Sequence, residues 1–166
     1  IDAPGHKEFL KNMITGAASA DAAVLLIAAN EGVQEQSRRH GYLLSLLGIK
    51  QVVVAINKMD LVGFSEDVFT RVREEYSAFL KQIGVEARTF VPISAREGIN
   101  IAKRGALDGS NPAPWYNGPS VLDMLDTFEP PVPLNDMPLR FPIQDVYRFD
   151  ERRIFAGRIE SGTLRV

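Results

Sequence analysis

The chain of 166 residues contains no cysteine, so disulfides, thiolate nucleophiles and cysteine-based metal sites are excluded. This composition fits a cytoplasmic protein. No apolar run approaches the roughly 18 residues of a membrane-spanning helix, and we expect no membrane association. The formal net charge is only −2, which gives no support for a broad electrostatic grip on nucleic acid. A local basic group is present at Arg38, Arg39 and His40, in which the two arginines belong either to a solvated helix face or to a contact surface.

The most informative motif is Asn57, Lys58 and Asp60, which directly follows the apolar run 51–56. Ligands of open α/β sheets bind at the carboxyl ends of strands. A carboxylate there can accept both the ring N–H and the exocyclic amine of guanine, whereas adenine would leave it unpaired, and we assign this role to Asp60. The stem of Lys58 can lie on the purine face with its ammonium in water, and the Asn57 amide can tie this loop to others. The alternative is a solvated strand-to-helix turn.

Two further motifs stand in an order that supports nucleotide binding. Asp2 and Gly5 form a D-x-x-G segment, in which Asp2 would hold Mg²⁺ through water and the Gly5 N–H would meet the γ-phosphate. Roughly 35 residues after the guanine motif, Ser94 and Ala95 follow another apolar run, and the Ala95 N–H could approach guanine O6. D-x-x-G, then N-K-x-D, then S-A indicates a P-loop GTPase that binds GTP or GDP with Mg²⁺.

One expected motif is missing from the 166 residues: the phosphate loop G-x-x-x-x-G-K-S/T. No switch threonine precedes Asp2 either. We therefore expect an N-terminally truncated domain that lacks its first strands, its phosphate-binding helix and the lysine of that loop. Such a fragment should bind nucleotide poorly and should not hydrolyse GTP by itself.

Apolar runs alternate with helical patterns along the first 90 or so residues. Strands that alternate with helices predict an α/β fold, a parallel sheet of the P-loop GTPase type flanked by helices. Gly48 ends one predicted helix, and Ser65 is the expected N-cap of another, whose apolar face comprises Val68, Val72, Tyr76, Phe79 and Leu80. The predicted elements are a helix over 9–18, a strand over 22–29, a helix over 35–47, a strand over 52–56 and a helix from 65 to about 84.

The amino-acid composition changes after Ser94. Residues 96–119 are rich in Gly, Pro, Asn and Ser, which predicts a packed surface loop anchored by Trp115 and Tyr116, unless these two serve a partner surface. Ser120 is the expected cap of a short helix. Residues 129–133 read as a stiff proline linker, and 139–147 and 153–159 as strands. The predicted domains are 1–129, the C-terminal part of a GTPase domain; 130–137, a linker; and 138–166, the start of a β-barrel domain.

The segment from Asp2 to His6, followed by residues 9–16, resembles the switch region of translation-factor-type GTPases, the superfamily of elongation factor Tu and its eukaryotic counterpart. The resemblance covers essentially the whole chain, because 139–146 is similar to the opening strand of that family's second domain, a β-barrel. It implies that His6 orients the water that attacks the γ-phosphate.

Within that superfamily, residues 37–49 and 114–119 resemble the R-R-H…S-L-L-G-I and P-W-Y-x-G-P signatures of the large, GTP-hydrolysing subunit of bacterial sulfate adenylyltransferase. Two segments depart from its pattern: 29–32 lacks the usual aspartate, and 96–98 is unusual. The resemblance implies a heterodimer with a smaller catalytic subunit. GTP hydrolysis on this subunit would drive ATP and sulfate to adenylyl sulfate and pyrophosphate on that partner.

Two alternatives remain. One is an elongation factor that delivers aminoacyl-tRNA, which would make RNA a partner. The other is a GTPase-derived binding module without hydrolysis, against which an intact upstream phosphate loop would argue.

Overall fold

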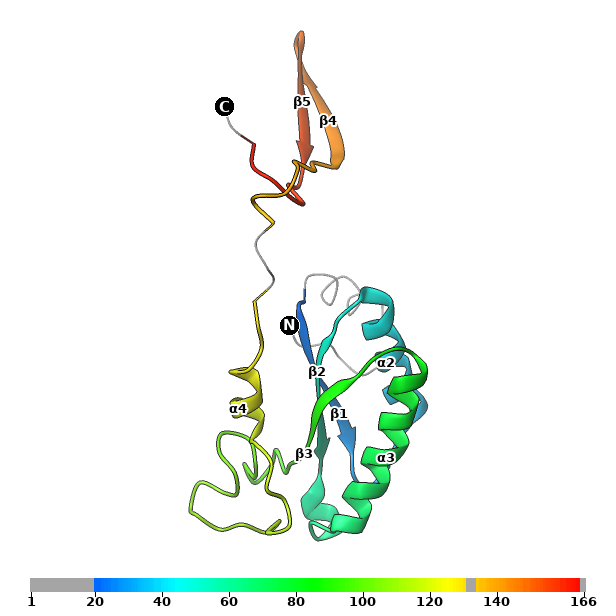
Figure 1. Cartoon of the computed structure of the whole chain (residues 1–166), viewed down its shortest axis with the longest axis vertical. Helices are drawn as coiled ribbons and strands as arrows, with labels where there is room; N and C mark the ends of the chain where they lie inside the picture. The colour runs from blue at the N-terminus through cyan, green and yellow to red at the C-terminus, as the bar shows by residue number, and fades with distance from the viewer. Residues whose placement is uncertain (1–19, 131–133, 165–166) are drawn as a thin grey trace. The chain divides into compact units, whose positions relative to one another are not determined.

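The computed structural model describes residues 20–130 and 134–164, and the chain divides into two compact units, 1–129 and 130–166 (Figure 1). Asp2, Gly5 and His6, together with the helix predicted over 9–18, lie outside the described residues. Among the residues that are described, no helix is long and apolar enough to cross a bilayer.

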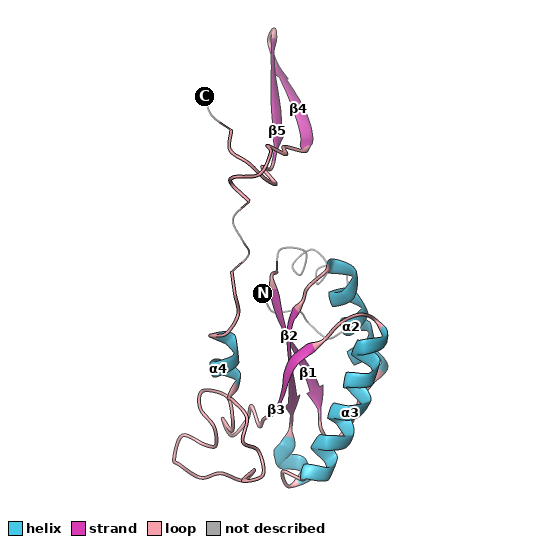
Figure 2. Ribbon diagram, viewed as in Figure 1, coloured by secondary structure: helices cyan, strands magenta, loops and turns pink. Residues whose placement is uncertain are grey.

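The first unit contains a parallel sheet in the order β1-β2-β3, with bounds Ala22–Ala28, Gln51–Asn57 and Ala87–Pro92. Residues Val52 to Ile56 of the central strand are at most 1% exposed, as expected for a parallel strand covered on both faces. Two helices, α2 (Glu35–Leu47) and α3 (Glu66–Gln82), lie side by side along the sheet (Figure 2). This confirms the predicted α/β fold class and its alternation of strands and helices.

Local signals explain where the helices begin and end. The Ser65 side chain accepts a hydrogen bond from the Val68 N–H at the start of α3, and Gly48 ends α2 with a φ of 70°. The predicted apolar face of α3 is correct except in one position, because Phe69 is buried and Val68 is only partly so. Four more residues of α3 complete the buried face: Val72, Tyr76, Phe79 and Leu80.

The two helices approach closely at Gly41. A Cβ added to Gly41 would lie 2.9 Å from Phe79 Cε1 and 3.2 Å from the Tyr76 hydroxyl. That hydroxyl donates a 2.6 Å hydrogen bond to the Ser37 carbonyl. Glycine is therefore the residue that lets α3 bring its aromatic face against α2.

The loop after β3 is packed, as its composition predicted. Trp115 Nε1 donates a 2.9 Å hydrogen bond to the Phe64 carbonyl, and its ring lies 5.2 Å from that of Phe69. Asn100 is fully buried, donates to the Pro92 carbonyl and accepts from the Gly105 N–H, each at 2.7 Å. The loop ends in the short helix α4 (Val121–Leu125), whose N-cap is the predicted Ser120.

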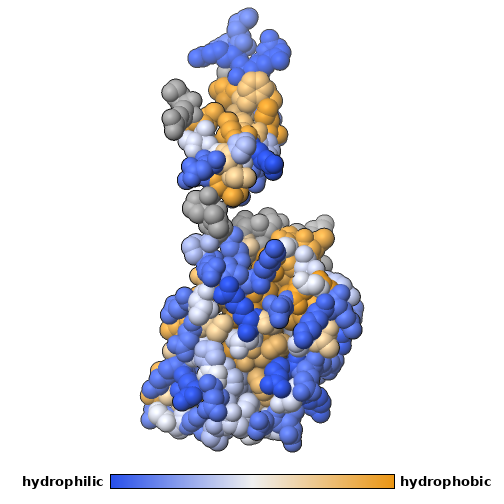
Figure 3. Space-filling view, viewed as in Figure 1, coloured by the Kyte–Doolittle hydropathy of each residue, from blue (hydrophilic) through white to orange (hydrophobic). Residues whose placement is uncertain are grey.

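The second unit is built on the antiparallel hairpin β4 (Ile143–Phe149) and β5 (Arg152–Gly157). The strand predicted over 139–147 was placed too early, since β4 begins after Pro142, which has no N–H to donate to a ladder. Arg140 instead forms an isolated bridge with Ser161. Apolar side chains of the hairpin are exposed, including Val146, Ile154 and Phe155, and they give its orange surface in Figure 3.

Candidate functional site

The loops after β2 and β3 meet at one edge of the sheet, because the two strands are parallel and Ile56 is paired with Pro92. The β2 loop begins at Asn57 and continues into the 3-10 helix η2 (Met59–Val62). Backbone hydrogen bonds join the loops: Ile93 N donates to the Ile56 carbonyl at 2.8 Å, and Met59 N to the Ile93 carbonyl at 3.1 Å. The structure thus brings the predicted residues Asn57, Asp60 and Ala95 onto neighbouring loops.

The side chain of Asn57 links the two loops directly. Its Oδ1 accepts hydrogen bonds from the Lys58 N–H at 2.7 Å and from the Ala95 N–H at 3.0 Å. This is the loop-tying contact expected for the Asn57 amide. It also means that the Ala95 N–H already has an acceptor, so a guanine O6 would have to share or replace the Asn57 oxygen.

Ser94 shapes the second loop from inside. The residue is fully buried, exchanges backbone hydrogen bonds with Ile99, and its Oγ accepts from the Glu97 N–H at 3.3 Å. Its side chain holds the turn together, and the exposed residue that follows is Ala95. Any contact of Ser94 with a ligand would therefore go through the turn that it stabilises.

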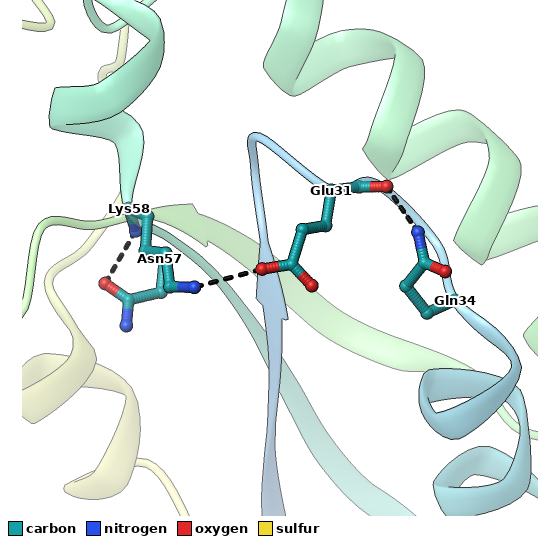
Figure 4. Close-up of polar contacts among 4 residues, drawn as sticks. All are labelled: Glu31, Gln34, Asn57 and Lys58. Atoms are coloured by element: carbon teal, nitrogen blue, oxygen red, sulfur yellow. Dashed lines mark hydrogen bonds and ion pairs between the residues drawn. The ribbon is translucent and has the colours of Figure 1, made fainter.

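Lys58 adopts an unusual backbone conformation and is held at both ends. Its φ of 61° lies in the left-handed region, which costs a residue with a side chain about 1–2 kcal/mol. Its Nζ lies 3.1 Å from Glu31 Oε1, where the Lys58 and Glu31 side chains are 47% and 52% exposed. The lysine ammonium, predicted to lie in water, is therefore paired with a carboxylate at the surface (Figure 4).

Asp60 lies at the start of η2 and is partly buried. Its neighbour Met59 is fully buried, and Phe64 N donates to the Met59 carbonyl at 2.9 Å, so the backbone that carries Asp60 is anchored in the core. No hydrogen bond or ion pair from any residue in 20–130 or 134–164 reaches the Asp60 carboxylate. An anchored acceptor that no described residue satisfies is suited to an external donor.

The basic group on α2 is engaged within the first unit. Arg38 donates to Glu75 at 2.9 Å and lies 5.0 Å from the Phe79 ring centroid, and Arg39 pairs with Glu35. His40 contacts Gln36 at 3.2 Å, and burial lowers the pKa of its imidazole. These contacts favour a structural role for the three side chains on α2.

The predicted Mg²⁺ ligand Asp2, the γ-phosphate contact Gly5 and the water-orienting His6 lie outside the described residues. Across 20–130 and 134–164, no three or more His, Cys, Asp and Glu side chains cluster as a metal site would require. The sequence analysis did not identify Glu31 as a partner of Lys58, although it noted that segment 29–32 lacks the aspartate usual in the sulfate adenylyltransferase subunit. It also missed Asn100, because its two partners are brought to it only by the fold.

Comparison with known proteins gives consistent similarities. Residues 1–131 match the family model described as the elongation factor Tu GTP-binding domain. Elongation factor 1-alpha of Methanopyrus kandleri is 48% identical over 100% of this chain and 39% of that protein. Sulfate adenylyltransferase subunit 1 of Citrobacter koseri is 48% identical over 99% of this chain and 34% of that protein. The chain thus spans 34% to 39% of the length of these relatives.

Solved structures show the same similarity. Sup35 complexed with GDP superposes with a TM-score of 0.59 at 32% identity, covering 98% of this chain and 39% of that one. Sup35 complexed with GMPPNP gives a TM-score of 0.57 at 34% identity, covering 89% of this chain and 38% of that one.

Proposed function

Because the chain belongs to the elongation factor Tu GTP-binding domain family, we propose that it supplies the base-recognition part of a GTP/GDP site in a protein that hydrolyses GTP. The observation that carries this proposal is the Asn57 carboxamide, which joins the loop of Asp60 to the loop of Ala95. Two loops fixed to one another can present a carboxylate and a backbone N–H to the same planar base.

Each residue has a distinct part in the proposed recognition. The Asp60 carboxylate accepts from the guanine ring N–H and exocyclic amine, and the Ala95 N–H donates to O6 in competition with Asn57. The stem of Lys58 covers one purine face. Ser94 holds the turn that presents Ala95. Adenine would place an amine against the Ala95 N–H and leave the Asp60 carboxylate unpaired, so the proposed site would prefer guanine.

The phosphate end of the proposed site rests on the sequence pattern. Asp2 would hold Mg²⁺ through water, since carboxylate oxygens suit that ion, and Gly5 would donate its N–H to the γ-phosphate. His6 would position the attacking water. The bound Mg²⁺ would neutralise negative charge on the phosphates.

For the whole protein, we propose the GTPase subunit of sulfate adenylyltransferase, acting with a smaller catalytic subunit. The R-R-H and P-W-Y-x-G-P segments support this, as does the similarity to sulfate adenylyltransferase subunit 1. Formation of adenylyl sulfate from ATP and sulfate is strongly uphill, so a phosphate-dependent switch on one subunit could drive it on the other.

A second candidate is an elongation factor that delivers aminoacyl-tRNA. Several relatives named elongation factor 1-alpha match over the whole chain at 47% to 49% identity, as closely as the sulfate adenylyltransferase subunit does.

Co-purification and turnover of the whole protein separate the two candidates. A sulfate adenylyltransferase subunit should co-purify with a smaller subunit, and its GTPase rate should rise when ATP and sulfate are both added. Tight, GTP-dependent binding of aminoacyl-tRNA with no response to sulfate would instead select the elongation factor.

Substitution of His6 tests whether the protein hydrolyses GTP or only binds it. Removing one water-positioning side chain should slow single-turnover hydrolysis by on the order of 10²–10⁴-fold and leave GTP affinity nearly unchanged. If His6→Ala hydrolyses GTP within a few-fold of the parent, His6 is a turn residue. If the parent binds GTP and does not hydrolyse it, the protein is a binding module.

A further inference from the structure

Glu31 and Lys58 form an ion pair between the turn after β1 and the loop after β2 (Figure 4). The two residues are 27 positions apart, and the parallel pairing of β1 with β2 brings them together. Within the described chain, Lys58 is thus the guanine-motif residue whose side chain is held by a carboxylate from another loop.

The backbone that carries Glu31 is fixed by local hydrogen bonds. The N–H groups of Glu31 and Gly32 both donate to the Ala28 carbonyl, at 3.1 and 2.9 Å. The Gln34 amide donates to the Glu31 carbonyl at 2.6 Å. At the start of the turn, Ala29 N donates to the Asn57 carbonyl at 2.7 Å, which ties this turn to the residue before Lys58. The Glu31 carboxylate is therefore presented from a turn that is itself anchored on the β2 loop.

Lys58 is fixed at its backbone by the bond from its N–H to Asn57 Oδ1, but its stem of four methylenes has many rotamers. A lysine that covers a purine face has to keep this stem in one orientation. The contact of its ammonium with Glu31 limits where the stem can lie, because the two ends of the side chain are then both held.

We propose that Glu31 is a positioning residue for guanine nucleotides: it holds the Lys58 ammonium so that the lysine stem is already ordered along the purine face when the base arrives. This inference rests on the proposed GTP/GDP site. Glu31 acts through Lys58 and does not itself touch the base.

The size of the effect follows from the exposure of the pair. Both side chains are about half exposed, so the interaction between Glu31 and Lys58 should be as weak as that of other exposed ion pairs. Its loss should change the dissociation constant of the nucleotide by about 1.4- to 5-fold. Glu31→Gln keeps the shape of the side chain and removes its charge. We expect a Kd for GDP that is higher by about 1.4- to 5-fold, mainly through faster dissociation.

The test uses the whole protein and measures Kd and dissociation rate with GDP for four variants: Glu31→Gln, Lys58→Met, their double variant, and Glu35→Gln as the matched control. Glu35 is also an exposed glutamate with a cationic partner, Arg39, on α2. If Glu31 acts through Lys58, Glu31→Gln has no further effect in the Lys58→Met background, and Glu35→Gln binds like the parent.

A second readout separates positioning from a structural role. Inosine diphosphate has the same purine face as GDP and lacks the exocyclic amine that Asp60 would bind. A positioning role in stacking predicts the same fold-loss on Glu31→Gln for both nucleotides, and a smaller loss at 1 M salt, where the Debye length is about 3 Å.

The outcomes distinguish this inference from the function on which it rests. If the parent does not bind GDP, both are overturned. If the parent binds GDP but Glu31→Gln has parental affinity, or weakens binding equally in the Lys58→Met background, the positioning role is wrong and the proposed nucleotide site stands.

Discussion

Asp60→Asn tests base recognition with little risk to the fold. The substitution exchanges one oxygen for nitrogen at a partly buried carboxylate that accepts no hydrogen bond from the described residues. The backbone on either side is held by the buried Met59 and by the bond from Phe64 N to the Met59 carbonyl. We therefore expect the free energy of unfolding to change by no more than about 0.5 kcal/mol.

The expected loss of guanine affinity is much larger. Hydrogen bonds to a charged group contribute roughly 1.5–3 kcal/mol each, and the new amide would accept from one guanine donor and oppose the other with its own NH₂. Because Asp60 is only partly buried, water can satisfy part of what is left. The net cost should be about 2–4 kcal/mol, or about a 30- to 700-fold higher Kd for GDP. Xanthine has a carbonyl in place of the amine, so XDP should gain affinity from the same substitution.

The assay is competition of GDP and XDP against a fluorescent guanine nucleotide on the whole protein, with thermal unfolding measured alongside. Asp126→Asn, at an exposed aspartate after α4, is the control and should leave both affinities unchanged. Unchanged GDP affinity in Asp60→Asn would refute the assignment of Asp60. Equal weakening of GDP and XDP would show that the substitution disturbs the loop and not the base contact.

Three further predictions concern the link between the two loops and the packing of the first unit. Asn57→Ala should remove the acceptor of the Ala95 N–H and lower the free energy of unfolding by about 1 kcal/mol. The NMR chemical shift of the Ala95 amide proton should change with the loss of this hydrogen bond, and an unchanged shift would contradict the contact between Asn57 and Ala95. Gly41→Val should lower the free energy of unfolding by roughly 2 kcal/mol in urea titration, because its side chain would overlap the Phe79 ring, and parental stability would contradict the close approach. Burial raises the pKa of Tyr116 to about 12. The stability that the neutral Tyr116 side chain contributes should therefore be complete below the ordinary tyrosine pKa of about 10 and should be lost as the pH rises through 12. Urea titrations at alkaline pH check the sign, because Tyr116→Phe should lose less stability than the parent over this pH range.

The sequence was sufficient for those parts of the fold that local signals determine. Gly48 and Ser65 mark a helix end and a helix start because each satisfies backbone groups within a few residues of itself. The phase of α3 was less certain from sequence: Val68 and Phe69 are adjacent and both apolar, and only the packing against Trp115 decides that Phe69 is the buried one.

Contacts between segments that are distant in the chain could not be predicted from the sequence. No local sequence pattern indicates the partner of Glu31 or of Asn100. The pairing of β1 with β2 brings Lys58 to Glu31, and the fold of the loop after β3 brings Asn100 to Pro92. The sequence motifs gave the residues of the candidate site and their order along the chain. They could not show that the Ala95 N–H is already bonded to Asn57, because that depends on side-chain orientation across two loops.

The burial of β2 has a consequence for how the recognition loops open. Its residues Val52 to Ile56 are covered on both faces and paired on both edges, so their amides can exchange with solvent only when the sheet itself comes apart. Asn57 is the last residue of β2, the strand whose backbone amides should exchange with solvent most slowly in the first unit. Local fluctuations of the long 96–119 loop can then occur without displacing the strand end that carries Asn57.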